Sequence, residues 1–144
     1  MENQWPGSPS FQFKLKPELD KFIKIGSKYL YIEKVNKLNW FGAFGACREI
    51  GGQLVIIQDK KELNSINDLI AHNDTYWLGI NDLAYEGIYR TWLSQENAPF
   101  VKWTLGEPNN ENDNQDCVVL FETTMWDLEC VKNRFFICEA IIEE

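Results

Sequence analysis

An acidic stretch between Trp103 and Val131 carries the side chains best suited to chemistry. It holds seven carboxylates and five side-chain amides, with no Lys or Arg among them. Clustered carboxylate and amide oxygens are the ligands that a hard cation such as calcium prefers. The alternative is a solvated loop rich in turns, because Pro and Asn favour turns on their own account. An EF-hand is excluded, since no Gly follows the alternating Asp and Asn residues and no Glu closes the loop at the required place.

Most of the net charge of the 144-residue chain comes from this acidic stretch. Its 22 acids and 14 bases give −8 at pH 7, but outside the acidic stretch 15 acids and 14 bases nearly balance. Phosphate binding requires a basic face, so no nucleic-acid partner is expected, and docking on an anionic membrane is disfavoured too. The longest aliphatic run, at 54–57, is far too short to span a bilayer. The content of 44% hydrophobic and 25% charged residues is typical of a globular domain.

Cysteine usage indicates an oxidising compartment. The chain has no Cys-x-x-Cys pair and a single histidine, His72, so a zinc site is not expected. Two disulfides in a secreted, extracellular protein are the better interpretation, although spacing alone leaves every pairing open. The triplet that begins at Asn73 is an N-glycosylation acceptor, which agrees with that compartment. The cysteines are Cys47, Cys117, Cys130 and Cys138.

The scarcity of side chains that could form a catalytic pair argues against an enzyme. His72 is expected to be exposed near the end of a helix, and without it no Ser/His or Cys/His nucleophile pair can be assembled. The acids are packed in a cluster of the metal-binding kind rather than placed on separate strands as in glycosidases. A non-enzymatic role is therefore predicted.

Hydrophobic periodicity predicts an α+β domain with helices first and most strands afterwards. Gly26-Ser27 separates two β-rich runs and predicts a hairpin. Asn39 can cap a first helix that Gly51-Gly52 ends, and Asp59 with Glu62 forms a capping-box-like start to a second. Strands are expected at 22–25, 28–32, 54–57, 77–80, 117–121, 125–128 and 135–139.

Two regions lie outside this regular pattern. Residues 81–115 are rich in Gly, Pro, Asn and aromatic residues, and a long irregular segment of this kind is usually functional. Residues 1–20 are interpreted as an N-terminal extension, partly a cloning remnant, in which the alternation at 11–15 predicts a short strand. The main domain is expected at 21–144.

Several motifs in order resemble the C-type lectin domain over residues 22–140. Trp77-Leu78-Gly79-Ile80 is similar to the core strand of the family, and Glu107-Pro108-Asn109 is identical to the sugar-binding tripeptide of its mannose-type members. The sequence around Ala98-Pro99-Phe100 and Trp103 is similar to that of secreted insect C-type lectins. The resemblance implies two helices packed on short antiparallel sheets, a long irregular loop region that binds calcium and sugar, and the pairing of Cys47 with Cys138 and Cys117 with Cys130.

The resemblance also implies a mechanism and a site. Calcium exchanges its water ligands readily, so two neighbouring sugar hydroxyls can complete its shell. A cis Pro108 would aim Glu107 and Asn109 the same way, one as acceptor and one as donor, an order that by resemblance selects equatorial vicinal hydroxyls as in mannose. Trp92 or Trp126 is a candidate for stacking on a sugar, with packing in the core as the alternative. The expected calcium and sugar ligands are Glu107, Asn109, Gln115 and Asp127.

The sequence departs from the family at its Trp-Asn-Asp strand. Depending on the alignment, Trp126 replaces the Asn or Leu128 replaces the Asp, so one ligand is lost and Asp127 is the acid that remains. Gln115 stands where the family has an acid, and Asp116 is either an aid to neighbouring ions or simply solvated. Two carboxylates instead of three predict a single weak calcium site, in the millimolar range of extracellular modules.

The predicted function is that of a calcium-dependent lectin of mannose type, whose partners are glycans or glycoproteins. The alternative is the same fold used to bind a protein or glycan without calcium. One lectin site binds a monosaccharide weakly, so avidity would need several copies, yet the sequence shows no collagen repeat or heptad that would supply them.

Overall fold

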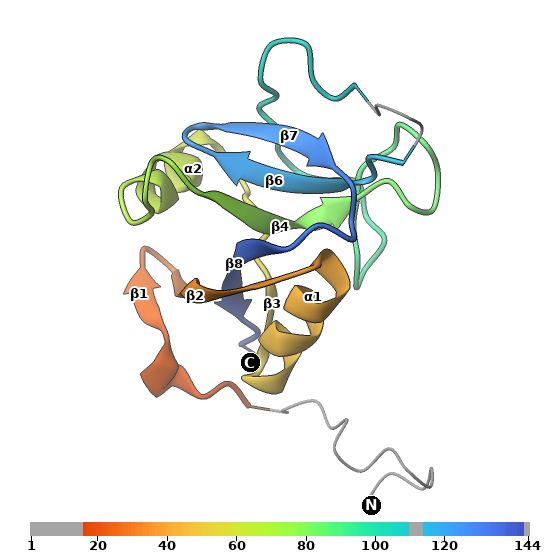
Figure 1. Cartoon of the computed structure of the whole chain (residues 1–144). Coiled ribbons are helices and arrows are strands. Elements are labelled where there is room, and N and C mark those ends of the chain that lie inside the picture. Colours follow the sequence, from red (N-terminus) through yellow and green to blue (C-terminus); the bar gives the residue numbers. More distant parts are fainter. Residues whose placement is uncertain (1–15, 110–113, 143–144) are drawn as a thin grey trace, which may run out of the picture.

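A computed structural model describes residues 16–109 and 114–142 of the chain (Figure 1). The strand expected at 11–15 lies outside the described residues. The elements in chain order are η1 (Leu19–Lys21), β1 (Ile23–Ile25), β2 (Lys28–Leu38), α1 (Trp40–Glu49), β3 (Gly52–Leu54), α2 (Lys60–Asn67), β4 (Thr75–Asn81), β5 (Arg90–Thr91), β6 (Cys117–Phe121), β7 (Thr124–Leu128) and β8 (Arg134–Ala140).

Local sequence signals explain where these elements begin and turn. Gly26, at φ +60°, forms with Ser27 the two-residue turn between β1 and β2. The Asn39 side chain accepts a hydrogen bond of 2.8 Å from the Gly42 N–H at the start of α1. At α2, Asp59 accepts from the Glu62 N–H at 2.8 Å. Both predicted caps and the predicted hairpin are confirmed.

The strands of the described chain form one eight-stranded sheet in the order β1-β2-β8-β4-β6-β7, with β3 paired to β8 and β5 to β4. All pairings are antiparallel except that of β4 with β8, which is parallel. The predicted α+β class is confirmed, and the sheet differs from the expected antiparallel arrangement at this one pairing. Only β5 interrupts the irregular region predicted at 81–115 in its described part.

Two apolar clusters account for the burial of the sheet. One contains Leu63 and Ile66 of α2 together with Leu78 of β4, and the other contains Trp40 of α1 together with Trp77 of β4. Because neighbouring residues of β4 point to opposite faces, the strand contributes to both clusters. Figure 1 shows α1 and α2 on different sides of the sheet.

Both predicted disulfides are present. Cys47 of α1 is joined to Cys138 of β8 across 91 residues, and Cys117 at the start of β6 is joined to Cys130 just after β7 across 13 residues. The first bond ties the first helix to the closing strand, and the second closes the β6–β7 hairpin. Among the described residues, no helix is long and apolar enough to cross a membrane.

Strand β4 packs against the backbone of residues 54–56 at Gly79. A Cβ atom at this position would lie 2.4 Å from the carbonyl oxygen of Leu54, and the Gly79 N–H donates to the Val55 carbonyl at 2.8 Å. Two buried indoles fix the same strand: Trp40 Nε1 donates to the Leu78 carbonyl at 2.7 Å, and Trp77 Nε1 donates to the Leu38 carbonyl at 2.9 Å.

Substitution of Gly79 by Ala is therefore expected to destabilise the fold. The added methyl meets backbone rather than a movable side chain, so we expect a loss of about 3 kcal/mol in the free energy of unfolding, at the upper end of the overpacking range. Gly45→Ala is the control, because nothing lies within 4 Å of its Cβ and it sits inside α1, where Ala gains about 0.5–1 kcal/mol over Gly. Urea unfolding with intact disulfides measures both; equal stabilities for the two variants would contradict the close approach.

Candidate functional site

The long loop returns to β7 at Met125 and is held there by backbone hydrogen bonds. The Thr104 N–H donates to the Met125 carbonyl at 2.9 Å, and the Met125 N–H donates to the Lys102 carbonyl at 2.8 Å. A turn follows, closed by the Glu107 N–H on the Thr104 carbonyl at 2.8 Å. These bonds place the tripeptide that starts at Glu107 next to the C-terminal part of β7.

The tripeptide makes its second contact with β7 at Asp127. The Glu107–Pro108 peptide bond is cis, as in the mechanism that the resemblance implies. Asn109 Nδ2 donates to Glu107 Oε2 at 2.9 Å, and the Asn109 N–H donates to Asp127 Oδ1 at 3.1 Å. Three of the four expected ligands, Glu107, Asn109 and Asp127, are thus brought together. Gln115 is half-buried just before β6, and its role as a ligand stays a prediction.

The two carboxyls of this group lie against each other. Asp127 is 2% exposed, and Glu107 Oε1 is buried without a hydrogen-bond partner. Burial first, and then the neighbouring carboxyl of Asp127, raise the pKa of Glu107 to about 7. A buried carboxyl oxygen without a donor, in a group that lies beside a second carboxyl, suits a cation. The residues therefore fit calcium, which is the ion that this oxygen-rich set prefers.

A second group of acids lies at the end of β4. Carboxylate oxygens of Asp82, Glu86 and Asp116 are all within 4.8 Å of one another. Asp82 Oδ2 accepts from the Gly87 N–H at 2.7 Å, while Asp82 Oδ1 and Asp116 Oδ1 are buried without a partner. Burial, followed by the carboxyl of Asp82, raises the pKa of Asp116 to about 6, and burial also raises that of Asp82. This group also fits a divalent cation.

The sequence interpretation missed Asp82 and Glu86. A signal was present, because Asp82 directly follows a buried strand and Glu86 comes four residues later, at the start of the irregular region. What the sequence could not supply is the pairing of β4 with β6, in which Asn81 faces Cys117 and so brings Asp82 next to Asp116. The Asp82 N–H donates to the Asp116 carbonyl at 2.9 Å.

Strand β7 shows why one family ligand is lost. Met125 and Asp127 are buried, whereas Trp126 and Leu128 alternate to the opposite face and pack against the cluster that contains Trp40. The Trp126 ring lies 5.3 Å from that of Phe121. Asp127 is therefore the β7 carboxylate at the site, whichever alignment is chosen.

Neither Trp92 nor Trp126 presents a freely exposed ring on which a sugar could stack. Trp92 packs against Trp40 with ring centroids 5.5 Å apart, and both Trp92 and Trp126 belong to the partly buried rim of the same apolar cluster. The alternative of a core role is the one that the structure supports. His72 and Asn73 are both exposed in a turn before β4, which leaves Asn73 accessible as the predicted glycosylation acceptor.

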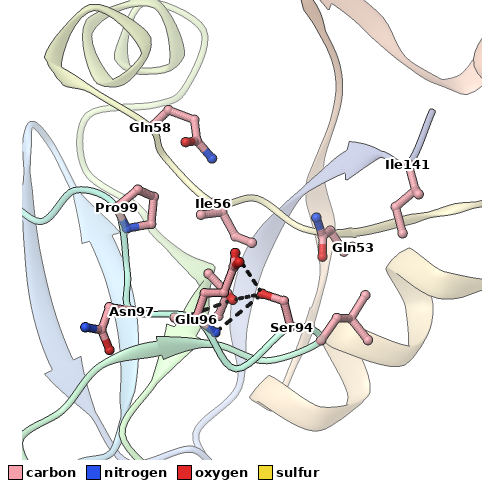
Figure 2. A pocket seen from close by; sticks show the side chains of 10 residues that line it. Gln53, Ile56, Gln58, Ser94, Glu96, Asn97, Pro99 and Ile141 are labelled. Carbon is pink, nitrogen blue, oxygen red and sulfur yellow. Dashed lines mark hydrogen bonds between the residues drawn. The ribbon is translucent and has the colours of Figure 1, made fainter. Parts of the chain in front are cut away.

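A separate hollow of about 410 Å³ lies between β3, the segment that leads to α2 and the loop after β5 (Figure 2). Its polar side chains largely bind one another: Thr91 Oγ1 and Ser94 Oγ lie 2.6 Å apart, and Ser94 Oγ is 3.4 Å from Glu96 Oε1. The hollow contains none of the residues of either acidic group.

Residues 36–140 match the family model described as the lectin C-type domain. The chain belongs to the C-type lectin family. Accessory gland protein Acp29AB of Drosophila simulans is 38% identical over 125 residues, which cover 85% of this chain and 52% of that protein. C-type lectin 37Db of Drosophila melanogaster is 37% identical over 121 residues, 81% of this chain and 80% of that protein. The insect relationship expected from the sequence is confirmed.

Solved structures agree on the fold of this C-type lectin domain. The carbohydrate-recognition domain of the mouse scavenger receptor C-type lectin has a TM-score of 0.79 and 24% identity, covering 85% of this chain and 96% of that chain. The chain spans about half the length of the accessory gland protein that it matches. The domain thus belongs to a carbohydrate-binding family whose members commonly bind calcium.

The pKa of Glu107 predicts an unusual pH dependence of stability in the presence of a chelator. Its value rises from 4.5 to about 7 on folding, so across this window the folded chain keeps a proton that the unfolded chain releases. Stability should therefore fall as the pH rises from 4.5 to 7, and Asp116, raised from 3.8 to about 6, acts in the same direction.

Glu107→Gln tests this expectation, because an amide neither titrates nor repels Asp127. At pH 8 with chelator the variant should melt at a higher temperature than the wild type, and the difference should shrink at pH 5. Glu122→Gln, at the exposed turn between β6 and β7, removes the same charge away from Asp127 and should change little. Circular dichroism melts measure the differences; a wild type that becomes more stable from pH 5 to pH 8 would contradict the assignment.

Proposed function

We propose that this domain is a calcium-dependent lectin in which Glu107, Asn109, Gln115 and Asp127 hold the ion and the sugar. The observation that carries the proposal is that Glu107 Oε1 is buried without a hydrogen-bond partner while the carboxyl of Asp127 lies beside that of Glu107. No Lys or Arg occurs between Trp103 and Val131 to neutralise these acids. A divalent cation is the group that satisfies both carboxyls at once.

The arrangement of the chain's own groups supports mannose-type selectivity. Glu107 is an acceptor and Asn109 Nδ2 a donor, and their mutual hydrogen bond of 2.9 Å holds them side by side. Two vicinal hydroxyls that exchange into this pair would each donate to the carboxylate or accept from the amide. Bound calcium would supply coordination of the same two hydroxyls. The bond from the Asn109 N–H to Asp127 Oδ1 holds this pair beside the carboxylate of β7.

Glycans or glycoproteins are accordingly the proposed partners, and binding rather than catalysis the proposed role. The two disulfides and the exposed acceptor Asn73 support secretion to an extracellular, oxidising compartment. The family model and the insect relatives support this class of function. Trp126 contributes no oxygen, which supports a calcium affinity in the weak range of extracellular modules.

Glu107→Gln is expected to weaken calcium binding at least tenfold. The substitution keeps size and hydrogen-bonding capacity but removes one of two carboxylates, and a charged ligand next to a divalent ion contributes more than the ~1.4 kcal/mol that a tenfold change requires. Binding of methyl α-mannoside should fall in parallel, because the ion is part of the sugar's pocket. Titration calorimetry with calcium, and then with the sugar, measures both effects.

Glu122→Gln is the matched control and should leave both affinities within about twofold, since its charge is exposed at the far end of the β6–β7 hairpin. A wild type that binds sugar without any calcium heat at millimolar concentration would contradict the proposal. The calcium-independent alternative would then hold. One feature favours it: with a pKa near 7, Glu107 can share a proton with Asp127 in place of a metal.

Asp82, Glu86 and Asp116 support a second ion next to the first. Asp116→Asn should reduce the number of calcium ions measured by calorimetry from two to one. The substitution removes the carboxylate that the start of β6 places beside Asp82 at the end of β4. Stoichiometry in Asp116→Asn equal to that of the wild type would exclude this group as a calcium site.

A further inference from the structure

The segment that ends in the sugar-binding tripeptide forms an exposed edge of the candidate site. Glu107 is half-buried, whereas the residues on either side of it are exposed, namely Leu105, Gly106, Pro108 and Asn109. Leu105 has no part in the proposed binding of calcium and hydroxyls. Its side chain is 101% exposed, which is the highest value of any large apolar residue in the described part of the chain.

The backbone at Leu105 is fixed by the turn that leads into the tripeptide. The Glu107 N–H donates to the Thr104 carbonyl at 2.8 Å, and Gly106 takes the left-handed conformation at φ +89°. Leu105 is therefore the second residue of a turn whose third residue has positive φ, and this second position favours Pro rather than a large apolar side chain. Neither the turn nor the core requires a leucine here.

Leu105 is close enough to contact a sugar that Glu107 holds. Two steps of about 3.8 Å along the backbone limit the distance between their Cα atoms to about 7.6 Å, comparable with the width of one substituted sugar ring. In mannose the anomeric carbon lies across the ring from the 4-hydroxyl. A substituent on that carbon therefore lies about one ring width from the hydroxyls that the site binds, which is the range that Leu105 covers.

We infer that Leu105 is a specificity-determining residue that contacts an apolar group on the anomeric carbon of the bound sugar, so the site favours aryl and alkyl glycosides. The inference rests on the proposed calcium-dependent sugar site and names its ligand class. Covering about 50 Å² of apolar surface strengthens binding about eightfold. The cause is removal of apolar surface from water rather than a charge, so the preference must persist at high salt.

Four glycosides of one sugar test the inference: methyl, 2-hydroxyethyl, n-butyl and phenyl α-mannoside. All keep the vicinal 3- and 4-hydroxyls, and only the anomeric substituent differs. In the presence of calcium, NMR titration of the full chain should show the butyl and phenyl glycosides binding about fivefold more tightly than the methyl glycoside. The polar 2-hydroxyethyl glycoside should bind within about twofold of the methyl glycoside, and the order should be the same in 0.5 M sodium chloride.

Leu105→Ser removes the apolar side chain and should reduce the phenyl-to-methyl affinity ratio to less than about twofold, whereas Leu105→Met, which stays apolar, should keep it. Val35→Ser is the matched control, because Val35 is 82% exposed on β2, which three strands of the sheet separate from β7. This control should leave the ratio unchanged. Each ratio is measured within one protein sample, so a loss of folded protein does not mimic the effect.

Three results would overturn the inference in different ways. If the wild type binds the methyl and phenyl glycosides equally, Leu105 does not contact the ligand, and the lectin site stands. If Leu105→Ser keeps the full preference, the apolar contact lies elsewhere, as at Tyr85, which is 59% exposed next to Glu86 of the second acidic group. If no glycoside binds in the presence of calcium, the proposed function itself fails, and the inference fails with it.

Discussion

The position of strand β4 is the constraint on which the rest of the domain depends. Its backbone lies so close to residues 54–56 that Gly79 has no room for a side chain, and the indoles of Trp40 and Trp77 bind it from two directions. Strands β6 and β8 pair with it on either side. Once β4 is fixed, its last residue delivers Asp82, and the paired end of β6 delivers Asp116. The sheet thus positions Asp82, Asp116 and Asp127, while the loops add Glu86, Glu107 and Asn109.

This division explains how the domain can hold several carboxylates close together. Asp82 and Asp127 are each 2% exposed, and burial of an acid beside other acids is unfavourable when the acids are charged. The sheet, the two disulfides and the apolar clusters offset that cost without any contribution from the site. A cation that binds only the folded chain then stabilises it by mass action. In the proposed calcium-bound form, ion binding and stability are coupled because the same carboxylates determine both.

The elements that sequence reasoning predicted are those whose causes are local. The Asn39 and Asp59 caps and the turn at Gly26 depend on residues within one turn of chain, and all three are confirmed. The parallel pairing of β4 with β8 joins distant segments and left no local pattern. The residues of the site show the same contrast between local and long-range causes. Glu107 and Asn109 stand in one tripeptide, whereas Asp82 approaches Asp116 only through the β4–β6 pairing.

Trp126 and Leu128, the two residues that could stand at the lost ligand position, both pack against the core. On β7 the side chains alternate, so a residue between Met125 and Asp127 must face the apolar cluster in which Phe121 and Trp126 meet. An Asn there would have to reach round the strand to bind a metal, whereas an indole buries a large apolar surface where it stands. Trp126 therefore contributes to the face that holds β6 and β7 together. Whichever alignment holds, Trp126 serves the packing of the hairpin, and Asp127 on the other face of β7 lies beside Glu107.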